Sequence, residues 1–204
     1  MFLSSLVFLG ACMAATSGEA STEGFADLPV PGPGQAVAVV AGGCFWCMES
    51  DLDKLEGVVH TTSGYAGGHV ERPEYMAVAG QTTGHLEAVH VVYDTTKLSY
   101  EQVITYFFHH VDPTDDGGQF CDRGPEYATG IFPVDAEQAR VAKTVKAGLG
   151  LSKPVVTKVY PAGGKFWTAE AYHQDFHHTN PGRYGSYRLG CGRDAKVRAI
   201  WGPG

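Results

Sequence analysis

The feature that most constrains the fold is an apolar, partly β-branched run at positions 36–41 that ends in the pair Gly42-Gly43. A run of this kind, closed by glycines, is typical of a buried strand. Apolar residues at helical spacing follow it until Gly57, namely Phe45, Met48, Leu52 and Leu55. A strand that turns directly into a helix places Cys44 in the first turn of that helix.

The segment 86–93 alternates between two sets of side chains that are both largely apolar. This pattern predicts a central strand that is covered on both faces. Glu87 lies within it, and a carboxylate is rarely buried without a partner or a task. Glu87 is therefore a candidate functional residue.

Two further helices carry capping signals at their N-termini. Ser99, with Gln102 three residues later, forms a capping box ahead of a wide apolar stripe. Asp135, with Gln138 at the third position, begins a helix that is expected to reach Gly150.

The last third of the chain is expected to contain a helix capped by Thr168 that carries Tyr172 and Phe176, followed by a coiled tail that holds Cys191. Further strands are expected at 58–68, 128–132 and 155–160. Strands and at least three helices therefore interleave irregularly over one sheet. This order predicts a single compact two-layer domain of the α/β (α+β) class.

The composition limits the domain count and the partners. A chain of 204 residues with 44% apolar residues can bury one compact core, which we assign to 36–204, after a Pro/Gly-containing linker at 21–35. The net charge of −7 and the lack of a basic run argue against nucleic acid as a partner. A monomer is the default expectation.

The first 20 residues contain an apolar run of signal-peptide length that is too short to span a bilayer. We expect export to the periplasm or cell envelope. No Lys or Arg precedes the run, so a cytoplasmic location is the alternative. Leu9-Gly10-Ala11-Cys12 is either a lipid-attachment box, with Cys12 as a lipid anchor, or an ordinary cleavage region.

Cys44 has the setting of a reactive thiol. The first turn of a helix favours negative charge and lowers the pKa of a cysteine there, and two preceding glycines leave the sulfur approachable. Phe45 and Trp46 follow it directly. We expect Phe45 to serve mainly in the core and Trp46 to line a substrate pocket.

Cys47 lies three residues after Cys44, so the two sulfurs share one face of the helix. The spacing has three interpretations: a redox pair, half of a zinc site, or an incidental buried thiol. The zinc site would be completed by Cys121, Cys191, His173, His177 or His178. No second Cys-x-x-Cys follows, and the three histidines are expected on the polar face of their helix.

Five blocks, read together, resemble the ordered motifs of the type A peptide methionine sulfoxide reductases. They are GGCFWCMES, GYAGG, RPEYMAVAGQTTGHLEAVHVVYD, GQFCDRGPEYATGIF and AEAYHQDF. The resemblance covers roughly 38–202. It implies a ferredoxin-like sandwich and the thiol-dependent reduction of methionine S-sulfoxide, free or within oxidised proteins.

The resemblance also assigns roles to residues. Cys44 corresponds to the nucleophile that attacks the sulfoxide sulfur, and Glu87 to the acid that protonates the oxygen. Apolar surroundings would raise the pKa of Glu87 enough for this role near neutral pH. The substrate-binding positions implied by the family are Phe45 and Trp46 for the methyl group, Tyr75 and Tyr127 for the oxygen, and Asp122.

Turnover would leave Cys44 as a sulfenic acid that a second thiol converts into a disulfide. An external dithiol such as thioredoxin would then restore the enzyme, with no metal or organic cofactor. Many family members have Gly at the position of Cys47, and the tail also differs here. We rank the resolving candidates as Cys191, then Cys47, then Cys121.

Two alternatives remain from the sequence. A general Cys-x-x-Cys thiol–disulfide oxidoreductase built on Cys44 and Cys47 would need no Glu87 and would act only on disulfides. A zinc-stapled binding module would hold metal when purified and would unfold with a chelator.

Overall fold

The computed structural model describes residues 28–202. The expected signal segment at 1–20, the lipid-anchor candidate Cys12 and the first part of the 21–35 linker lie outside the described residues. Within the described part, no helix combines the length and the apolar character that a bilayer crossing requires.

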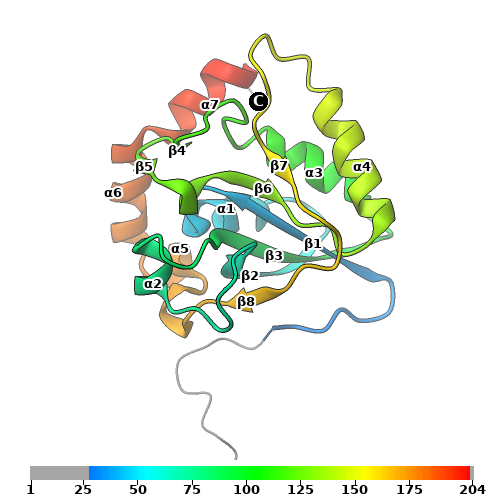
Figure 1. Ribbon diagram of the computed structural model, residues 1–204, viewed down its shortest axis with the longest axis horizontal. Helices are drawn as coiled ribbons and strands as arrows, with labels where there is room; N and C mark the ends of the chain where they lie inside the picture. Colours follow the sequence, from blue (N-terminus) through cyan, green and yellow to red (C-terminus); the bar gives the residue numbers. More distant parts are fainter. Residues whose placement is uncertain (1–27, 203–204) are drawn as a thin grey trace, which may run out of the picture.

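The main sheet has six strands in the order β7-β6-β1-β3-β2-β8 (Figure 1). All neighbouring strands are antiparallel except β6 and β7. Their bounds are Gln35–Gly42 (β1), Val58–Ala66 (β2), Leu86–Asp94 (β3), Thr129–Ile131 (β6), Lys158–Val159 (β7) and Phe166–Thr168 (β8). A separate two-stranded sheet consists of β4 (Gly118–Gln119) and β5 (Asp122–Arg123).

The helices follow the strands in an interleaved order. Their bounds are Phe45–Leu52 (α1), Tyr75–Ala79 (α2), Tyr100–Phe108 (α3), Ala136–Ala147 (α4), Phe176–Thr179 (α5), Pro181–Cys191 (α6) and Arg193–Trp201 (α7), with 3₁₀ turns at Pro125–Tyr127 (η1) and Ala171–His173 (η2). The unit β1-α1-β2-β3-α3-β6 with strand order β6-β1-β3-β2 is a ferredoxin-like sandwich. The predicted fold class is confirmed.

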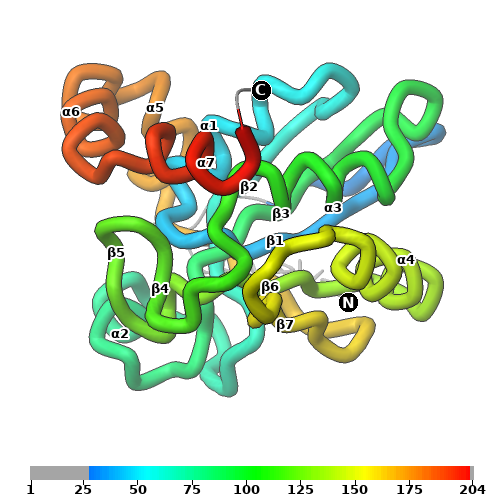
Figure 2. Tube along the Cα trace, turned by 90° about the horizontal axis from the view of Figure 1, so that it is seen from above, coloured from blue at the N-terminus to red at the C-terminus, as the bar shows by residue number. Residues whose placement is uncertain are grey.

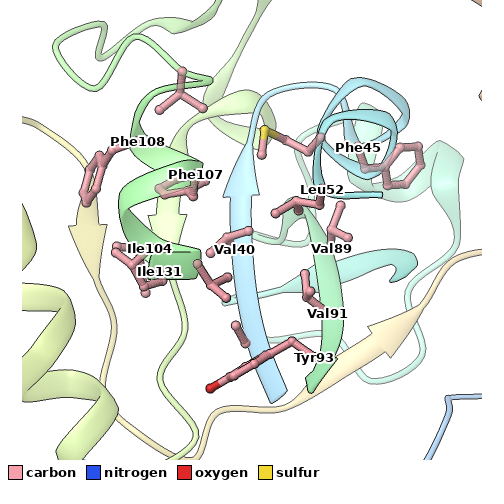
Figure 3. Packing of buried hydrophobic residues seen from close by; sticks show 14 of the residues in the cluster. Val40, Phe45, Leu52, Val89, Val91, Tyr93, Ile104, Phe107, Phe108 and Ile131 are labelled. Carbon is pink, nitrogen blue, oxygen red and sulfur yellow. The ribbon is translucent and has the colours of Figure 1, made fainter. Parts of the chain in front are cut away.

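β3 lies between β1 and β2 in the sheet, and both of its faces are apolar. Val89 and Val91 pack under α1 and α3 in the main core (Figure 3), whereas Leu86 and Ala88 belong to a second cluster on the opposite face. Successive strand side chains point to opposite faces. Glu87 therefore points to the same side as Val89, towards the layer that contains α1.

The capping signals in the sequence are confirmed. The Ser99 side chain accepts from the backbone N–H of Gln102, and the Gln102 side chain accepts from the N–H of Ser99. Asp135 caps α4 through the N–H of Gln138, and α4 ends at Ala147, three residues earlier than expected.

The prediction of a helix capped by Thr168 is wrong. Thr168 instead ends β8 and pairs with Gly64 of β2. Asp175 has a left-handed backbone with φ 50°, which interrupts any continuous helix, so a 3₁₀ turn and the short α5 replace it. The strand expected at 155–160 is also reduced to the two residues of β7.

The expectation of a coiled C-terminal tail is also wrong, because α6 and α7 occupy most of this segment. Glycine-rich sequence has low helix propensity, but long-range contacts stabilise the helices here. Cys191 at the end of α6 forms a disulfide with Cys121, and Arg193 at the start of α7 is buried. Figure 2 shows α5, α6 and α7 gathered beside α1, at the opposite end of the molecule from α4.

Leu52→Ala should lower the free energy of unfolding by about 2–5 kcal/mol, because it leaves a cavity in the main core. The matched control is Leu189→Ala, since Leu52 is 0% exposed and Leu189 is 84% exposed. Urea denaturation of the two variants and the parent protein measures the difference. Equal losses in both variants would contradict the assignment of Leu52 to the core.

Candidate active site

The turn after β1 presents Cys44 at the N-cap of α1, one position before the first helical residue. Gly43 makes the turn possible. Its φ is +81°, and a Cβ on it would lie 2.5 Å from Cβ of Gln119. The carbonyl of Cys44 accepts the N–H groups of Cys47 and Met48 at 3.1 and 3.2 Å, which begins the helix. The sulfur of Cys44 therefore lies at a helix N-terminus, as predicted.

Glu87 meets the same helix end from β3. Its Oε2 accepts the backbone N–H of Phe45 at 2.9 Å, and the residue is buried. Burial raises the pKa of Glu87 to about 8, although the hydrogen bond from Phe45 opposes the shift. The carboxyl group consequently keeps its proton at neutral pH. Oε1, which does not accept from Phe45, is the oxygen that can carry this proton towards a ligand.

A cavity of about 90 Å³ joins these groups. It is lined by Cys44, Phe45, Trp46, Tyr75, Glu87, Asp122, Tyr127 and Tyr187. The structure thus brings together all seven residues that the sequence assigned to catalysis or substrate binding, and it adds Tyr187. A larger cavity of about 390 Å³ beside Tyr160 and Lys165 contains none of them.

The aromatic wall of this cavity is fixed by neighbours from the chain's second half. Nε1 of Trp46 donates to Nδ1 of His173 at 3.1 Å, and its ring stacks on Phe176 with 3.7 Å between centroids. Phe45 is buried in the main core and also lines the cavity. Both residues therefore present rigid apolar surfaces, in line with the expected division of roles.

His173 was expected on a polar face of a helix, and that expectation is wrong. It is buried between Trp46, Phe45 and Tyr75. Burial lowers the pKa of His173 to about 4, so the ring is neutral and can accept from Trp46. No periodic pattern predicts this burial, because His173 lies in the 3₁₀ turn η2 rather than in a helix.

Tyr75 and Tyr127 place two hydroxyl groups at the cavity. The backbone N–H of Tyr75 is held by Oε1 of Glu170 at 2.8 Å. Burial raises the pKa of both tyrosines, so both hydroxyls stay protonated and able to donate. Asp122 closes another side, where its Oδ2 accepts from the hydroxyl of Tyr187.

Cys44 and Cys47 are both free thiols and interact with each other. Burial, followed by the hydrogen bond and charge of Cys47, raises the pKa of Cys44 well above its ordinary value. The lowering expected from the helix terminus is therefore wrong. The hydrogen bond from Cys44 lowers the pKa of Cys47, so a negative charge on this pair belongs on the sulfur of Cys47.

The other two resolving candidates are bonded to each other. Cys121 and Cys191 form a disulfide with 5.0 Å between their Cα atoms. In this state neither has a free thiol, and Cys47 is the free thiol beside Cys44.

Two clusters of metal-ligating groups occur within residues 28–202. They are Asp53 with His177 and His178, and Cys121 with Asp122 and Cys191. Neither cluster includes Cys44 or Cys47. Within the described residues, the structure therefore gives no support to a zinc site built on the Cys-x-x-Cys pair.

Three residues that support the site were not predicted from the sequence. Glu170 and Gln174 lie in the block AEAYHQDF, and Gln174 ties the turn at η2 to β2 by exchanging hydrogen bonds with the backbone of Ser63 at 2.9 and 3.0 Å. Glu170 accepts from the hydroxyl of Tyr65 as well as from Tyr75. Tyr187 lies in a segment expected to be coil, so no pattern pointed to it.

Comparison with known proteins gives one family. The family model described as "Peptide methionine sulfoxide reductase" matches residues 36–203. The chain is 45% identical over 172 residues to peptide methionine sulfoxide reductase MsrA 2 of Caulobacter vibrioides, covering 83% of this chain and 87% of that protein. It is 42% identical to MsrA of Bacillus subtilis, with coverage of 81% and 96%.

Solved structures agree with these relatives. Methionine sulfoxide reductase A of Corynebacterium diphtheriae superposes with a TM-score of 0.67 at 30% identity, covering 74% of this chain and 77% of that one. Mxr1 of Saccharomyces cerevisiae in reduced form gives a TM-score of 0.66 at 27% identity, with coverage of 75% and 90%.

Glu87→Gln should remove a pH dependence of stability. Between its ordinary pKa of 4.5 and about 8, folded Glu87 holds a proton that the unfolded chain releases, so the free energy of unfolding falls as pH rises. The wild type should lose up to roughly 1.4 kcal/mol per pH unit relative to the variant across this window. Urea denaturation at a series of pH values measures both. Parallel pH profiles would show that Glu87 titrates normally.

Proposed function

The chain belongs to the peptide methionine sulfoxide reductase family, and from that premise we propose how its residues carry out the reaction. The enzyme reduces methionine sulfoxide to methionine. One observation carries the assignment of roles. Cys44 and a Glu87 that holds its proton at neutral pH line the same small cavity, and the backbone of α1 fixes one to the other.

The first step joins Cys44 to the substrate. The sulfur of Cys44 bonds to the sulfoxide sulfur, the sulfoxide oxygen takes the proton of Glu87, and the proton of the Cys44 thiol returns to the Glu87 carboxylate. The oxygen then moves to Cys44, and methionine leaves. The substrate sulfur is reduced by two electrons, and Cys44 is oxidised by two to a sulfenic acid.

The remaining cavity residues hold the substrate for this attack. Tyr75 and Tyr127 donate to the oxygen as negative charge develops on it. Phe45 and Trp46 receive the methyl group on sulfur. Asp122 lines the substrate cavity beside them. We propose the S-sulfoxide as the substrate, which is the configuration that the family resemblance implies.

Cys47 is the proposed resolving thiol. It is the free thiol in contact with Cys44, and on one helical turn the two sulfurs can bond without a large movement. Cys47 attacks the sulfur of Cys44, the S–O bond breaks, and the oxygen leaves as water. An external dithiol of the thioredoxin kind then reduces the disulfide.

The site is a poor match for a general thiol–disulfide oxidoreductase. Such enzymes exchange thiols for disulfides, and that exchange leaves no substrate oxygen to be protonated. They also need no proton donor at a second cavity wall, where Glu87 lies. The observed cavity therefore favours sulfoxide reduction.

We extend the proposal to the setting in which the enzyme works. A monomer in the periplasm or cell envelope, exported by the first 20 residues, would repair methionine residues in proteins damaged by oxidants. Intact-mass measurement of the mature protein tests the cleavage of the segment and a lipid on Cys12. A full-length mass with free Cys12 would contradict both export and lipidation.

Cys44→Ser should abolish reduction of a methionine-S-sulfoxide peptide with dithiothreitol, because the attacking sulfur is lost. Glu87→Gln should lower kcat by about 10²–10⁴-fold, because the proton donor is lost. Methionine release is quantified by chromatography. Insulin disulfide reduction is the parallel assay, and activity there without sulfoxide turnover would favour the general oxidoreductase instead.

Cys47→Ser should still form about one methionine per enzyme but should lose most steady-state turnover with a thioredoxin system, by roughly 10-fold or more. The double variant Cys121→Ser/Cys191→Ser is the control, and it should keep both phases. The reverse pattern, with turnover lost only in the double variant, would make the disulfide pair the resolving thiols.

A further inference from the structure

Arg193 at the start of α7 is a buried cation without a hydrogen-bonded carboxylate among residues 28–202. Its guanidinium donates to the carbonyls of Gly42 and His110 at 3.2 and 2.8 Å and to the sulfur of Met48 at 2.9 Å. The nearest acidic oxygen is Oδ2 of Asp51 at 3.5 Å, and Nε of Arg193 has no hydrogen-bond partner.

Arg188 of α6 shares the same carboxylate. It contacts Oδ1 of Asp51 at 2.8 Å and Oδ1 of Asp194 at 2.6 Å, and it donates to the hydroxyl of Tyr184 at 2.8 Å. The Asp194 side chain is 52% exposed, so water screens its charge, whereas that of Asp51 is 3% exposed. Two largely buried guanidinium groups therefore face one buried carboxylate.

An excess buried cation is costly unless a further negative charge lies nearby. Asp51 is four residues after Cys47 on α1, so both side chains lie on the face that meets α6 and α7. Cys47 is 1% exposed and packs in one cluster with Tyr184 and Phe176. A thiolate at Cys47 would supply the missing negative charge.

We propose that Arg193 and Arg188 hold Cys47 as the thiolate that attacks the oxidised Cys44. This inference rests on the proposed role of Cys47 as the resolving thiol. The Cys47 sulfur forms the S–S bond, the S–O bond of the Cys44 sulfenic acid breaks, and the departing hydroxide takes a proton from solvent to leave as water. The arginines act as positioning residues, because neither touches the reacting oxygen.

The charge environment of Cys47 supports this role. The hydrogen bond from Cys44 contributes most to its lowered pKa, the charges of Arg193 and Arg188 act in the same direction, and burial and Asp51 oppose them. Oxidation of Cys44 removes its thiol donor, so the arginines remain as the stabilising groups. The charged and titratable groups that face Cys47 are Cys44, Asp51, Glu87, Tyr184, Tyr187, Arg188 and Arg193.

The first experiment titrates Cys47 directly. In a Cys12→Ser/Cys44→Ser background, Cys47 is the only cysteine outside the Cys121–Cys191 disulfide, and the ultraviolet absorbance of its thiolate is measured against pH, with the same background carrying Cys47→Ser as the blank. Arg188→Met and Arg193→Met should each move the midpoint upward by about one to three pH units.

The matched variants separate charge from packing. Arg198→Met removes an exposed cation from the same helix α7 and should leave the midpoint unchanged. Arg188→Lys should restore most of the shift, because it keeps the charge. If Arg193→Met does not fold, the Arg188 variants decide. A midpoint that stays at the Arg198→Met value in every folded variant would overturn the proposal.

The second experiment follows one turnover of the enzyme with its catalytic cysteines intact by rapid quenching. Methionine release reports the first step, and loss of the Cys47 thiol reports the second. Arg188→Met should slow the second step by roughly tenfold relative to the first at neutral pH and recover as pH rises. An unchanged ratio would overturn the inference. A disulfide that excludes Cys47, located by peptide mass, would instead refute the proposed resolving role.

Discussion

The hydrogen bond from the N–H of Phe45 to Glu87 is the contact on which the site depends. It fixes the start of α1 to the central strand β3, so the attacking sulfur and the acid keep a constant relation to each other. The same burial that makes this bond strong also keeps Glu87 protonated. One element of the sandwich thus carries the proposed nucleophile, and its neighbour carries the proposed proton donor.

The parts of the site that could be predicted are those with local signals. Gly42-Gly43 marks the strand-to-helix turn at Cys44, and a carboxylate on a strand with two apolar faces marks Glu87. The capping pairs at Ser99 and Asp135 specify two helices with little help from distant residues. For cavity residues outside the main sheet and the helices, such as Asp122 in the short strand β5, only the resemblance of the motif blocks pointed to the site.

The rest depends on contacts between distant segments. The glycine-rich C-terminus gives no helical pattern, yet a disulfide to Cys121 and the burial of Arg193 stabilise two helices there. His173 becomes a neutral acceptor for Trp46 only because the chain folds back over α1. The pKa of Cys44 was misjudged for a related reason: the helix terminus was visible in the sequence, but the degree of burial was not.

The burial of both free thiols has a consequence for the order of events in time. In the proposed mechanism a protein dithiol has to bring its own sulfur into line with the Cys44–Cys47 bond, yet Cys44 and Cys47 are only 6% and 1% exposed. The sulfoxide group has to enter only a cavity of about 90 Å³, whereas a protein reductant brings a whole surface with its sulfur. Under that mechanism, recycling requires the contacts around Trp46, Phe176 and α6 to open, and the frequency of that opening sets an upper limit on how fast the enzyme can be reused.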